Sequence, residues 1–410
     1  MTARLLDISR LVSRAGLGAL TGIDRVELAY LREFIRRPEP LFGLCRLPRS
    51  YAVLNEEALR RLEPYLSGDQ PMPKAGLAKL LFPKFPAGRQ AAIAQVFRAS
   101  SGVASPRRLK QLIAKHVDAR FRYFNVGHAN LRAEVFQACG NSRKTVFIHD
   151  LIPLSSPEYS TPEVREKMLK AVKIVSEHAD DLIYNSNATQ SEAQGVFAQF
   201  GSVLPGVVSH LGGAATSAIR PASEKPKFHI IGTIEPRKNH RLLLDIWEQF
   251  TIDHPAEEIP ELHIIGRRGW LNQSVFTTLD VLPMMGKHVF EHGTLSDAET
   301  TAMLAESWGL LFPSKAEGFG LPLIEAAALG VPILCGQNAI YHEILGDYPL
   351  YLNVDNSYDW SKEILGRAGR TRESEADRQT RAASVKLPDW PSHFDRIFGS
   401  VTFPNRENDG

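Results

Sequence analysis

The residues best placed to do chemistry stand in two short segments, and the first is basic. The segment GTIEPRKNH (232–240) sets Arg237 and Lys238 side by side just before a predicted helix. The N-terminus of a helix already favours anions, so two cations there lower the stability of the helix itself. The segment therefore predicts a bound anion, and a diphosphate would suit it. A solvated basic loop is the alternative.

The second segment, EGFGLPLIEAAALG (317–330), is acidic and rich in glycine. Glu317 precedes Gly318 and Gly320, and Glu325 is expected near the first turn of the helix that follows. Glycines let the backbone approach a ligand closely, and a carboxylate accepts hydrogen bonds from sugar hydroxyls. Glu325 could hold two adjacent hydroxyls of a ribose, as acidic residues do in dinucleotide-binding folds. Its alternative role is to complement the helix dipole.

Strands and helices alternate five times in the second half of the chain, and this alternation positions both segments. An apolar strand is predicted over 227–233, a helix capped by Asn239 over 239–250, and another strand over 308–314. Such alternation predicts a doubly wound parallel sheet. Ligands of these sheets bind beyond the carboxyl ends of the strands, so both segments should share one edge.

The first half repeats this scheme less regularly. Strands are predicted over 4–9, 122–127, 144–150 and 181–186, with a helix over 22–37. The expected fold class is α/β, with two Rossmann-like doubly wound domains that face a cleft. The expected domains are an acceptor-binding domain 1–222, a nucleotide-sugar-binding domain 223–385, a C-terminal helix 386–402 that packs back on the first domain, and a tail 403–410.

Composition excludes several classes of protein. The 410 residues are 43% hydrophobic and 23% charged, without any apolar run of eighteen residues, which is typical of globular chains. The chain start lacks the features of a signal peptide, and the cysteines are few and far apart, so we expect a cytoplasmic protein. There is no P-loop, nucleophile elbow, zinc-protease motif or Asp-x-Asp triplet. We therefore expect no metal and no cofactor.

Charge is unevenly distributed along the chain. Residues 74–122 contain eleven lysines and arginines and a single acid, Asp118, although the net charge of the whole chain is only +2. Leucines and phenylalanines interleave with these cations. Basic amphipathic segments often lie on anionic membrane surfaces. A solvated basic face is an equal alternative, and no motif for nucleic-acid binding accompanies the stretch.

The two chemical segments together resemble the retaining glycosyltransferases of the GT-B fold, family four, also known as glycosyl transferases group 1. The resemblance is strongest over 228–355, in GTIEPRKN, in the run 291–334 and in AIYHEILGD. It implies that Glu317 contacts the donor sugar, Glu325 contacts the nucleoside ribose, and Arg237 with Lys238 holds the diphosphate. Many members carry an arginine where this chain has Thr233, so the role of Arg237 is less secure than that of Lys238.

Three segments of the first half extend the resemblance. They are LTGIDRVELAYLREF (20–34), VFIHDLIPLSSPEY (146–159) and LIYNSNAT (182–189). The catalytic residues so implied are His149, Lys238 and Glu317, although a lone histidine is more often structural. The implied donor-binding residues are Gly22, Thr233, Arg237, Lys238, Glu317, Gly318, Phe319, Gly320, Leu321 and Glu325. The implied acceptor-binding residues are Asp24, Arg25, Asp150 and Ser186.

The function expected from the resemblance is a metal-independent, retaining hexosyltransferase. It would move a mannose-like or glucose-like hexose from a nucleotide diphosphate sugar to a growing, lipid-linked bacterial surface polysaccharide, on the inner face of the membrane. The expected partners are that donor, a glycan acceptor and an anionic membrane surface at 74–122, and no nucleic acid. The alternatives are a nucleotide-sugar epimerase, a phosphorylase of the same fold, and a non-catalytic scaffold of a glycan-assembly complex.

Overall fold

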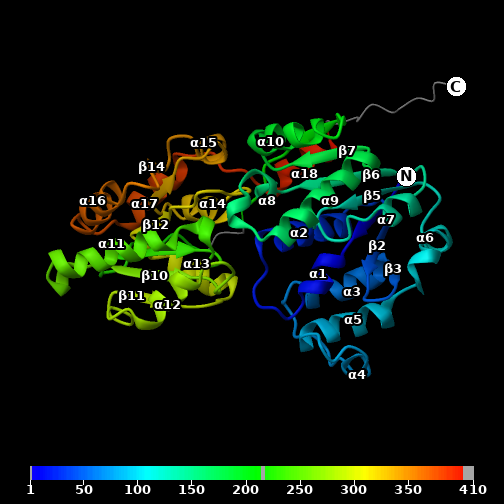
Figure 1. The fold of residues 1–410 in the computed structure, drawn as a ribbon, viewed down its shortest axis with the longest axis horizontal. Helices are drawn as coiled ribbons and strands as arrows, with labels where there is room; N and C mark the ends of the chain where they lie inside the picture. Colours follow the sequence, from blue (N-terminus) through cyan, green and yellow to red (C-terminus); the bar gives the residue numbers. More distant parts are fainter. Residues whose placement is uncertain (1, 214–217, 400–410) are drawn as a thin grey trace. The chain divides into compact units, whose positions relative to one another are not determined.

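The computed structural model of the chain describes residues 2–213 and 218–399. Contacts divide it into two compact units, each built on its own sheet (Figure 1). The first unit comprises the residues up to Leu151, Glu166–Asn185 and Thr189–Val208, and the second comprises Ile152–Arg165, Ser186–Ala188 and the residues from Ser209 onward. The expected domain limits and the packing of 386–402 stay predictions. The expected tail 403–410 and the end of 386–402 lie outside the described residues.

The first unit contains an eight-stranded sheet in the order β4-β3-β2-β1-β5-β6-β7-β8. Its strands are β1 (Ala3–Asp7), β2 (Leu41–Arg46), β3 (Tyr51–Asn55), β4 (Gly102–Ala104), β5 (Phe121–Asn125), β6 (Arg143–Ile148), β7 (Asp181–Tyr184) and β8 (Gly206–Val208). Strand β3 is antiparallel to both β2 and β4, and the other pairs are parallel. The antiparallel edge was not predicted from the sequence.

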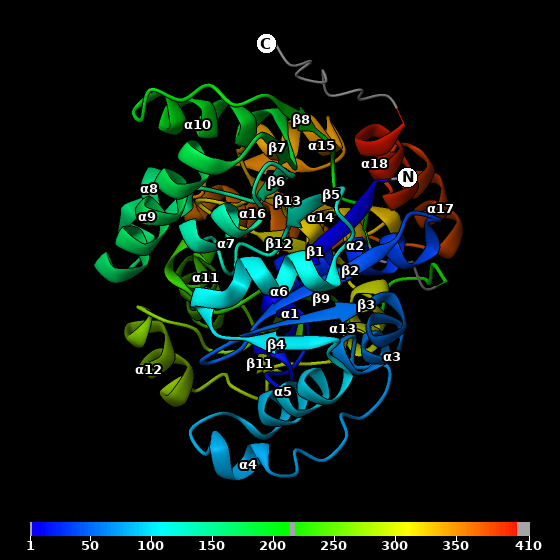
Figure 2. The same ribbon diagram turned by 90° about the vertical axis from the view of Figure 1, so that its right-hand side faces the viewer.

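Helices connect and cover these strands. They are α1 (Ser9–Arg14), α2 (Gly22–Arg36), α3 (Glu56–Leu66), α4 (Ala78–Leu81), α5 (Ala87–Ala99), η1 (Pro106–Arg108), α6 (Leu109–His116), α7 (Ala133–Ala138), α9 (Pro162–His178) and α10 (Asn187–Ala198). Apolar side chains of α2 recur at helical spacing and are buried, among them Val26, Tyr30 and Phe34. Figure 2 shows the same elements from the side of this unit.

The second unit contains a six-stranded sheet in the order β11-β10-β9-β12-β13-β14, and every pair is parallel. Its strands are β9 (Lys227–Ile231), β10 (Glu261–Ile265), β11 (Val289–Glu291), β12 (Gly309–Phe312), β13 (Ile333–Gly336) and β14 (Leu350–Leu352). The alternation predicted from the sequence is confirmed. Strands β9, β10 and β12 are buried almost throughout, as expected when helices cover both faces of a parallel sheet.

Most helices of the second unit follow its strands. The helices of this unit are α8 (Ile152–Ser155), η2 (Pro157–Tyr159), η3 (Pro236–Lys238), α11 (His240–Asp253), η4 (Ala256–Glu258), α12 (Gln273–Val281), α13 (Asp297–Ala305), α14 (Leu321–Ala328), α15 (Ala339–Leu345), α16 (Ser357–Ala368), α17 (Glu375–Ala383) and α18 (Trp390–Phe398). Of these, α8 and η2 follow β6 of the first sheet, and α17 and α18 come after the last strand. Ser296 and Glu299 form the capping box that the sequence predicts for α13.

The strand order of the second unit reverses between β9 and β12. From β9 the chain moves outward to β10 and β11, then returns to place β12 on the other side of β9. Ligands of open parallel sheets bind beside such a switch point, at the carboxyl ends of the two strands. The segments after β9 and β12 are those that carry Lys238 and Glu317, so the topology brings the two sequence motifs together.

Within residues 2–213 and 218–399, no helix is both long enough and apolar enough to cross a membrane.

Candidate functional site

The segment after β9 turns sharply and presents its side chains close to the neighbouring segment after β10. Gly232 has a φ of 143°, and a side chain at Gly266 would meet the Gly232 carbonyl oxygen at 1.9 Å, so only glycine fits at 266. The 3₁₀ helix η3 then carries Arg237 and Lys238 to the start of α11.

Asn239, between η3 and α11, does not cap α11 as the sequence predicted. It adopts the left-handed conformation, with φ 55° and ψ 41°, and makes no capping hydrogen bond. Its side-chain amide donates instead to the carbonyl oxygen of Val354, at 3.1 Å. Asparagine is one of the few residues other than glycine that tolerates this conformation. Asn239 therefore redirects the chain and ties this loop to the segment after β14.

The segment after β12 brings Glu317 onto both cations. Its carboxylate forms ion pairs with Lys238 Nζ and with Arg237 Nη1, the latter at 2.9 Å between the nitrogen and Oε1. The side chains of Lys238 and Glu317 are only 7% and 8% exposed. Arg237 also reaches Glu235, at 2.7 Å from Nη2 to Oε1. Two cations and two carboxylates thus form one compact cluster at the switch point.

Burial and charge act in opposite directions within this cluster. Burial alone raises the pKa of Glu317, but Arg237 and Lys238 together outweigh it and lower that pKa to about 2. Burial lowers the pKa of Lys238, and Glu317 opposes that shift. Burial raises the pKa of Glu235, whose Oε2 is buried without a hydrogen-bond partner. Glu317 is therefore ionised throughout the physiological pH range.

Backbone contacts fix the two loops against each other. The amide of Lys315 donates to the carbonyl oxygen of Arg237 at 2.7 Å, and Arg237 Nη1 donates to the carbonyl oxygen of Ala316 at 2.9 Å. The ammonium of Lys238 lies 4.3 Å from the ring centroid of Phe312, the last residue of β12. A cation over an aromatic face is stabilised further when it is desolvated. The charged groups are therefore held in place by main chain and ring.

The turn between Glu317 and α14 has the backbone that its glycines suggest. Gly320 precedes α14 with a φ of 93°, and Phe319 and Leu321 beside it are buried, while Gly318 is half-buried. Glu325 lies just beyond the first turn of the helix, close to where the sequence predicts it. The first turn of α14 carries no acid, because the helix already begins at Leu321 and places half-buried Glu325 in its second turn. The helix dipole acts mainly on the first turn, so complementing it explains Glu325 less well.

In the first unit, His149 follows β6 directly and is 4% exposed. Its Nε2 lies 2.7 Å from the carbonyl oxygen of Val126, and its ring is stacked on Phe147 with the centroids 4.4 Å apart. His128, with a positive φ of 54°, packs edge-on against the same ring at 4.9 Å. The structure thus anchors the imidazole firmly at the carboxyl end of β6. The catalytic role assigned to His149 stays a prediction.

The other residues predicted in the first half lie at helix starts and strand ends. Gly22 opens α2 and is exposed, and Arg25 is half-buried. Asp24 is fully buried, accepts hydrogen bonds from the backbone amide and hydroxyl of Thr21, and pairs with Arg10 at 2.6 Å. Capping the start of α2 is therefore enough to explain why a buried carboxylate stands at position 24. Its predicted acceptor-binding role is untested.

Asp150 and Ser186 each follow a strand of the first sheet, as predicted. Asp150 is half-buried after β6, and Ser186 is fully buried just before α10.

In the second unit, Thr233 is half-buried in the loop after β9 and stands beside Gly269, where an added side chain would collide with Thr233 at 2.5 Å. The structure therefore brings Arg237, Lys238 and Glu317 into direct contact, and places Thr233 and the turn 318–321 in the two loops that bear them.

Sequence reasoning missed two residues of the cluster. Glu235 stands two residues before Arg237, and its side chain is 2% exposed. An acidic residue within a basic loop could have indicated an ion pair with Arg237, although nothing in the sequence indicates that Glu235 is buried. The sequence did not indicate Phe312 as a site residue, because a phenylalanine at the end of a buried strand is normally explained by core packing alone.

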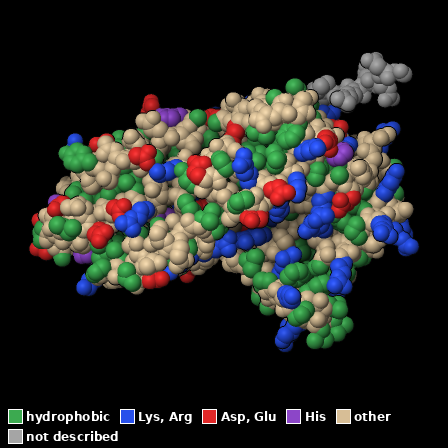
Figure 3. Space-filling view, viewed as in Figure 1, with side chains coloured by type: hydrophobic (Ala, Val, Ile, Leu, Met, Phe, Trp, Pro, Cys, Tyr) green, Lys and Arg blue, Asp and Glu red, His purple; other side chains and the backbone are tan. Residues whose placement is uncertain are grey.

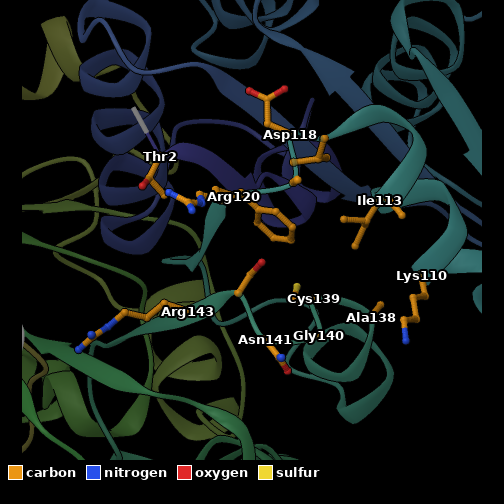
Figure 4. A pocket seen from close by; sticks show the side chains of 15 residues that line it. Thr2, Lys110, Ile113, Asp118, Arg120, Ala138, Cys139, Gly140, Asn141 and Arg143 are labelled. Atoms are coloured by element: carbon orange, nitrogen blue, oxygen red, sulfur yellow. The ribbon is translucent and has the colours of Figure 1, made fainter. Parts of the chain in front are cut away.

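A separate hollow of about 580 Å³ opens in the first unit (Figure 4). Its lining includes Thr2, Lys110, Arg120, Cys139 and Arg143. Thr2, Arg120 and Arg143 stand at the amino ends of β1, β5 and β6, which is the edge opposite to the carboxyl ends of those strands, where ligands of parallel sheets bind. Arg143 is turned to Asp181, at 2.6 Å. The hollow therefore lacks the features of the cluster in the second unit.

No group of three or more histidine, cysteine or acidic side chains suited to a metal ion occurs within the described part of the chain.

Comparison with known proteins places this geometry in a family. Residues 216–364 match the family model described as glycosyl transferases group 1. The chain carries a glycosyl transferases group 1 domain. This domain contains the whole cluster of Glu235, Arg237, Lys238 and Glu317.

Similar curated sequences are bacterial mannosyltransferases by name. This chain is 28% identical over 236 residues to the serotype-specific mannosyltransferase WbdA of Escherichia coli, a match that covers 53% of this chain and 29% of the relative. It is 32% identical over 135 residues to O-antigen chain mannosyltransferase B of Escherichia coli, a match that covers 33% of this chain and 35% of the relative. The matched part thus spans about a third of the length of these relatives.

Solved structures establish the fold. HepE of Anabaena, solved in complex with UDP and glucose, superposes with a TM-score of 0.63 at 15% identity, covering 98% of this chain and all of HepE. Sucrose-phosphate synthase from Thermosynechococcus elongatus superposes with a TM-score of 0.60 at 14% identity, covering 98% and 100%. The group 1 domain is thus part of a GT-B fold, and the fold predicted from the sequence is confirmed.

Proposed function

We propose that the protein is a retaining hexosyltransferase that uses a nucleotide diphosphate sugar. The observation that carries the proposal is the contact of Glu317 with Lys238 and Arg237 at the switch point of the second sheet. The buried Lys238 and the half-buried Arg237 at this edge suit a diphosphate, and a carboxylate beside them suits the hydroxyls of the attached sugar. The names of the curated relatives make mannose the first sugar to test. The acceptor we propose is a growing, lipid-linked bacterial surface polysaccharide at the cytoplasmic face of the membrane.

In the proposed reaction, the acceptor hydroxyl oxygen bonds to the anomeric carbon of the donor on the face that the diphosphate leaves. The bond between that carbon and the phosphate oxygen breaks, and its electron pair stays on the diphosphate. The hydroxyl proton passes to the leaving phosphate oxygen. Lys238 and Arg237 stabilise the charge that develops there, which is usually the largest single contribution to catalysis. Glu317 orients the sugar, and Glu325 binds the ribose.

The test is a screen of nucleotide sugars by thermal shift, followed by transfer to glycan acceptors. A true donor raises the melting temperature by mass action, and nucleoside diphosphate is released only when acceptor is present. Conversion of the nucleotide sugar to its epimer without acceptor would instead favour an epimerase, and dependence on inorganic phosphate a phosphorylase. If no nucleotide sugar binds, a non-catalytic scaffold is the better description. The anomeric configuration of the product, read by NMR, decides whether transfer retains it.

The replacement of Glu325 by alanine is expected to weaken binding of the free nucleoside diphosphate about tenfold, because one charge-assisted hydrogen-bonding group to the ribose is lost. Isothermal titration calorimetry without any sugar attached measures this directly. Glu325→Gln is the control, since it keeps the shape and part of the hydrogen bonding and should bind with intermediate affinity. Equal affinities for wild type and Glu325→Ala would leave Glu325 without a role in nucleotide binding.

Transfer is expected to continue in excess EDTA. The chain contains no Asp-x-Asp triplet, and two side-chain cations are available for the diphosphate. Initial rates with and without the chelator should agree within a factor of two or so. Complete loss of transfer that manganese or magnesium restores would assign the diphosphate to a metal ion instead of Lys238 and Arg237.

A further inference from the structure

The strongest unexplained feature outside the candidate site is a short helix that exposes three leucines. Leu77, Leu80 and Leu81 are 76%, 76% and 69% exposed, and they stand on or beside the four-residue helix α4. We refer to these three residues as the α4 tip. Large apolar side chains clustered in water are uncommon in monomeric proteins and mark interaction surfaces. In Figures 1 and 2, α4 lies at the lower extreme of the first unit in both views.

The base of this projection is anchored although its tip is exposed. The buried Gln90 side-chain amide donates to the carbonyl oxygens of both Phe82 and Phe85, each at 2.9 Å. The rings of Phe82 and Phe85 stack with centroids 5.8 Å apart, and Arg89 lies over Phe85 at 4.0 Å. The leucines are thus presented by a fixed support, so their exposure is not a consequence of a loose loop.

Cations surround the tip. Lys74, Lys79 and Lys84 are exposed beside it, and no aspartate or glutamate occurs between residues 70 and 117. The nearest acids before that stretch, Glu63 and Asp69, are both paired with Arg32. Figure 3 shows hydrophobic side chains gathered at this lower end of the unit, with lysines and arginines beside them. The exposed leucines of the α4 tip and the lysines beside them are together complementary to a surface that is negatively charged on its outside and apolar beneath.

The structure also shows which part of the basic stretch 74–122 could act as one surface. Arg107, Arg108, Lys110 and Lys115 belong to η1 and α6, which both views place well apart from α4. Residues 74–122 therefore do not form one basic face. The part that combines cations with exposed leucines is confined to 74–89.

We propose that residues 74–89 dock the protein on an anionic lipid bilayer, with the α4 tip inserted among the lipid headgroups and the three lysines on the surface. A four-residue helix that ends before Pro83 is far too short to span, so the contact is interfacial. Nucleic acid fits the charge but leaves the leucines in water. The proposal does not depend on the reaction proposed above.

The test is co-sedimentation of the full chain with vesicles of equal parts phosphatidylglycerol and phosphatidylcholine, compared with pure phosphatidylcholine. Each lysine near an anionic surface should strengthen binding about fivefold, and each inserted leucine roughly tenfold. The wild type should bind only the anionic vesicles and more weakly as salt rises. The variants Leu77→Ser/Leu80→Ser/Leu81→Ser and Lys74→Gln/Lys79→Gln/Lys84→Gln should each lose a hundredfold or more.

The matched control is Ile252→Ser/Val281→Ser, which removes two equally exposed apolar side chains of the second unit, at 72% and 73% exposed, and should bind like wild type. All the substituted side chains are exposed, so thermal melts should be unchanged. Failure of the wild type to bind anionic vesicles at low salt would overturn the proposal. Full binding by the leucine variant would overturn it too. A loss of self-association in that variant, seen by light scattering without any change in vesicle binding, would assign the tip to a contact between copies of the chain.

Discussion

Replacing Lys238 by alanine is expected to lower turnover about a hundred- to a thousandfold while the fold is kept. The ammonium is 7% exposed at the switch point, where it contacts Glu317 and lies over Phe312. Loss of one preorganised charged donor to the leaving group costs about 3–4 kcal/mol in the transition state. The measurement is the turnover number at saturating donor and acceptor, together with circular dichroism of the variant.

The matched control for Lys238 is Lys315→Ala. Lys315 stands in the loop after β12, but its Nζ pairs at 2.7 Å with Asp355, whose side chain is 71% exposed. Its removal should change turnover less than threefold or so, because exposed ion pairs contribute little. A turnover of Lys238→Ala within about tenfold of wild type, equivalent to 1.4 kcal/mol or less, would mean that Arg237 holds the diphosphate without it.

Replacing Glu317 by alanine is expected to abolish most transfer and also to destabilise the second unit by about 3–5 kcal/mol. Removal of one partner of a buried ion pair leaves the other charge uncompensated, and here two cations lose the same carboxylate. Urea unfolding of the second unit, monitored through the intrinsic fluorescence of the protein, measures the free energy of unfolding. Transfer assays at a temperature below the transition separate the loss of chemistry from the loss of fold.

Asp355→Ala is the control for stability, because it breaks an exposed carboxylate–lysine pair and should change the free energy of unfolding by less than about 1 kcal/mol. Glu317→Ala should also bind free nucleoside diphosphate more tightly than wild type, since its two cations are released from their internal partner. Wild-type stability together with unchanged transfer would remove Glu317 from the site.

The linkage between pH and stability has a definite sign at Glu317. Its pKa is held at about 2 in the folded state, below the ordinary 4.5 of a glutamate side chain. The stability that its ion pairs contribute is therefore complete above pH 4.5 or so and is lost only as pH falls towards 2. Acid inactivation at pH 5 to 6 would accordingly have another origin than protonation of Glu317.

The second unit was largely predictable, because most of its strands are apolar runs followed by a helix, although the half-buried strand β14 was missed. Strand β9 and the capping box of α13 were both visible in the sequence. Strands β2, β3 and β4 at one end of the first sheet and β8 at the other end were missed. Strands β4 and β8 have only three residues each. Strand β3 pairs antiparallel to both neighbours, so β2, β3 and β4 interrupt the strand–helix alternation on which the prediction depended.

The candidate site was predictable in its residues but not in its contacts. Residue type and position before a helix indicated Lys238 and Glu317 as members of a site. Their direct contact follows from the order of strands β9 and β12 in the sheet, which pairs segments far apart in the chain. The conformation of Asn239 and the burial of Glu235 depend on the packing of three loops, and no local pattern carries that information.

The contact between Glu317 and the two cations has a consequence for how a donor is gained and lost. If the proposed donor binds here, the carboxylate occupies the charges that its diphosphate needs, and so acts as a competitor tethered to the protein. A donor must displace it, and only a ligand that offers the freed carboxylate new hydroxyl partners recovers the cost in full. Inorganic phosphate offers none, and a bare nucleotide offers only the ribose hydroxyls that we assign to Glu325. Once the sugar has left, the carboxylate can return to the cations and help expel the spent nucleotide.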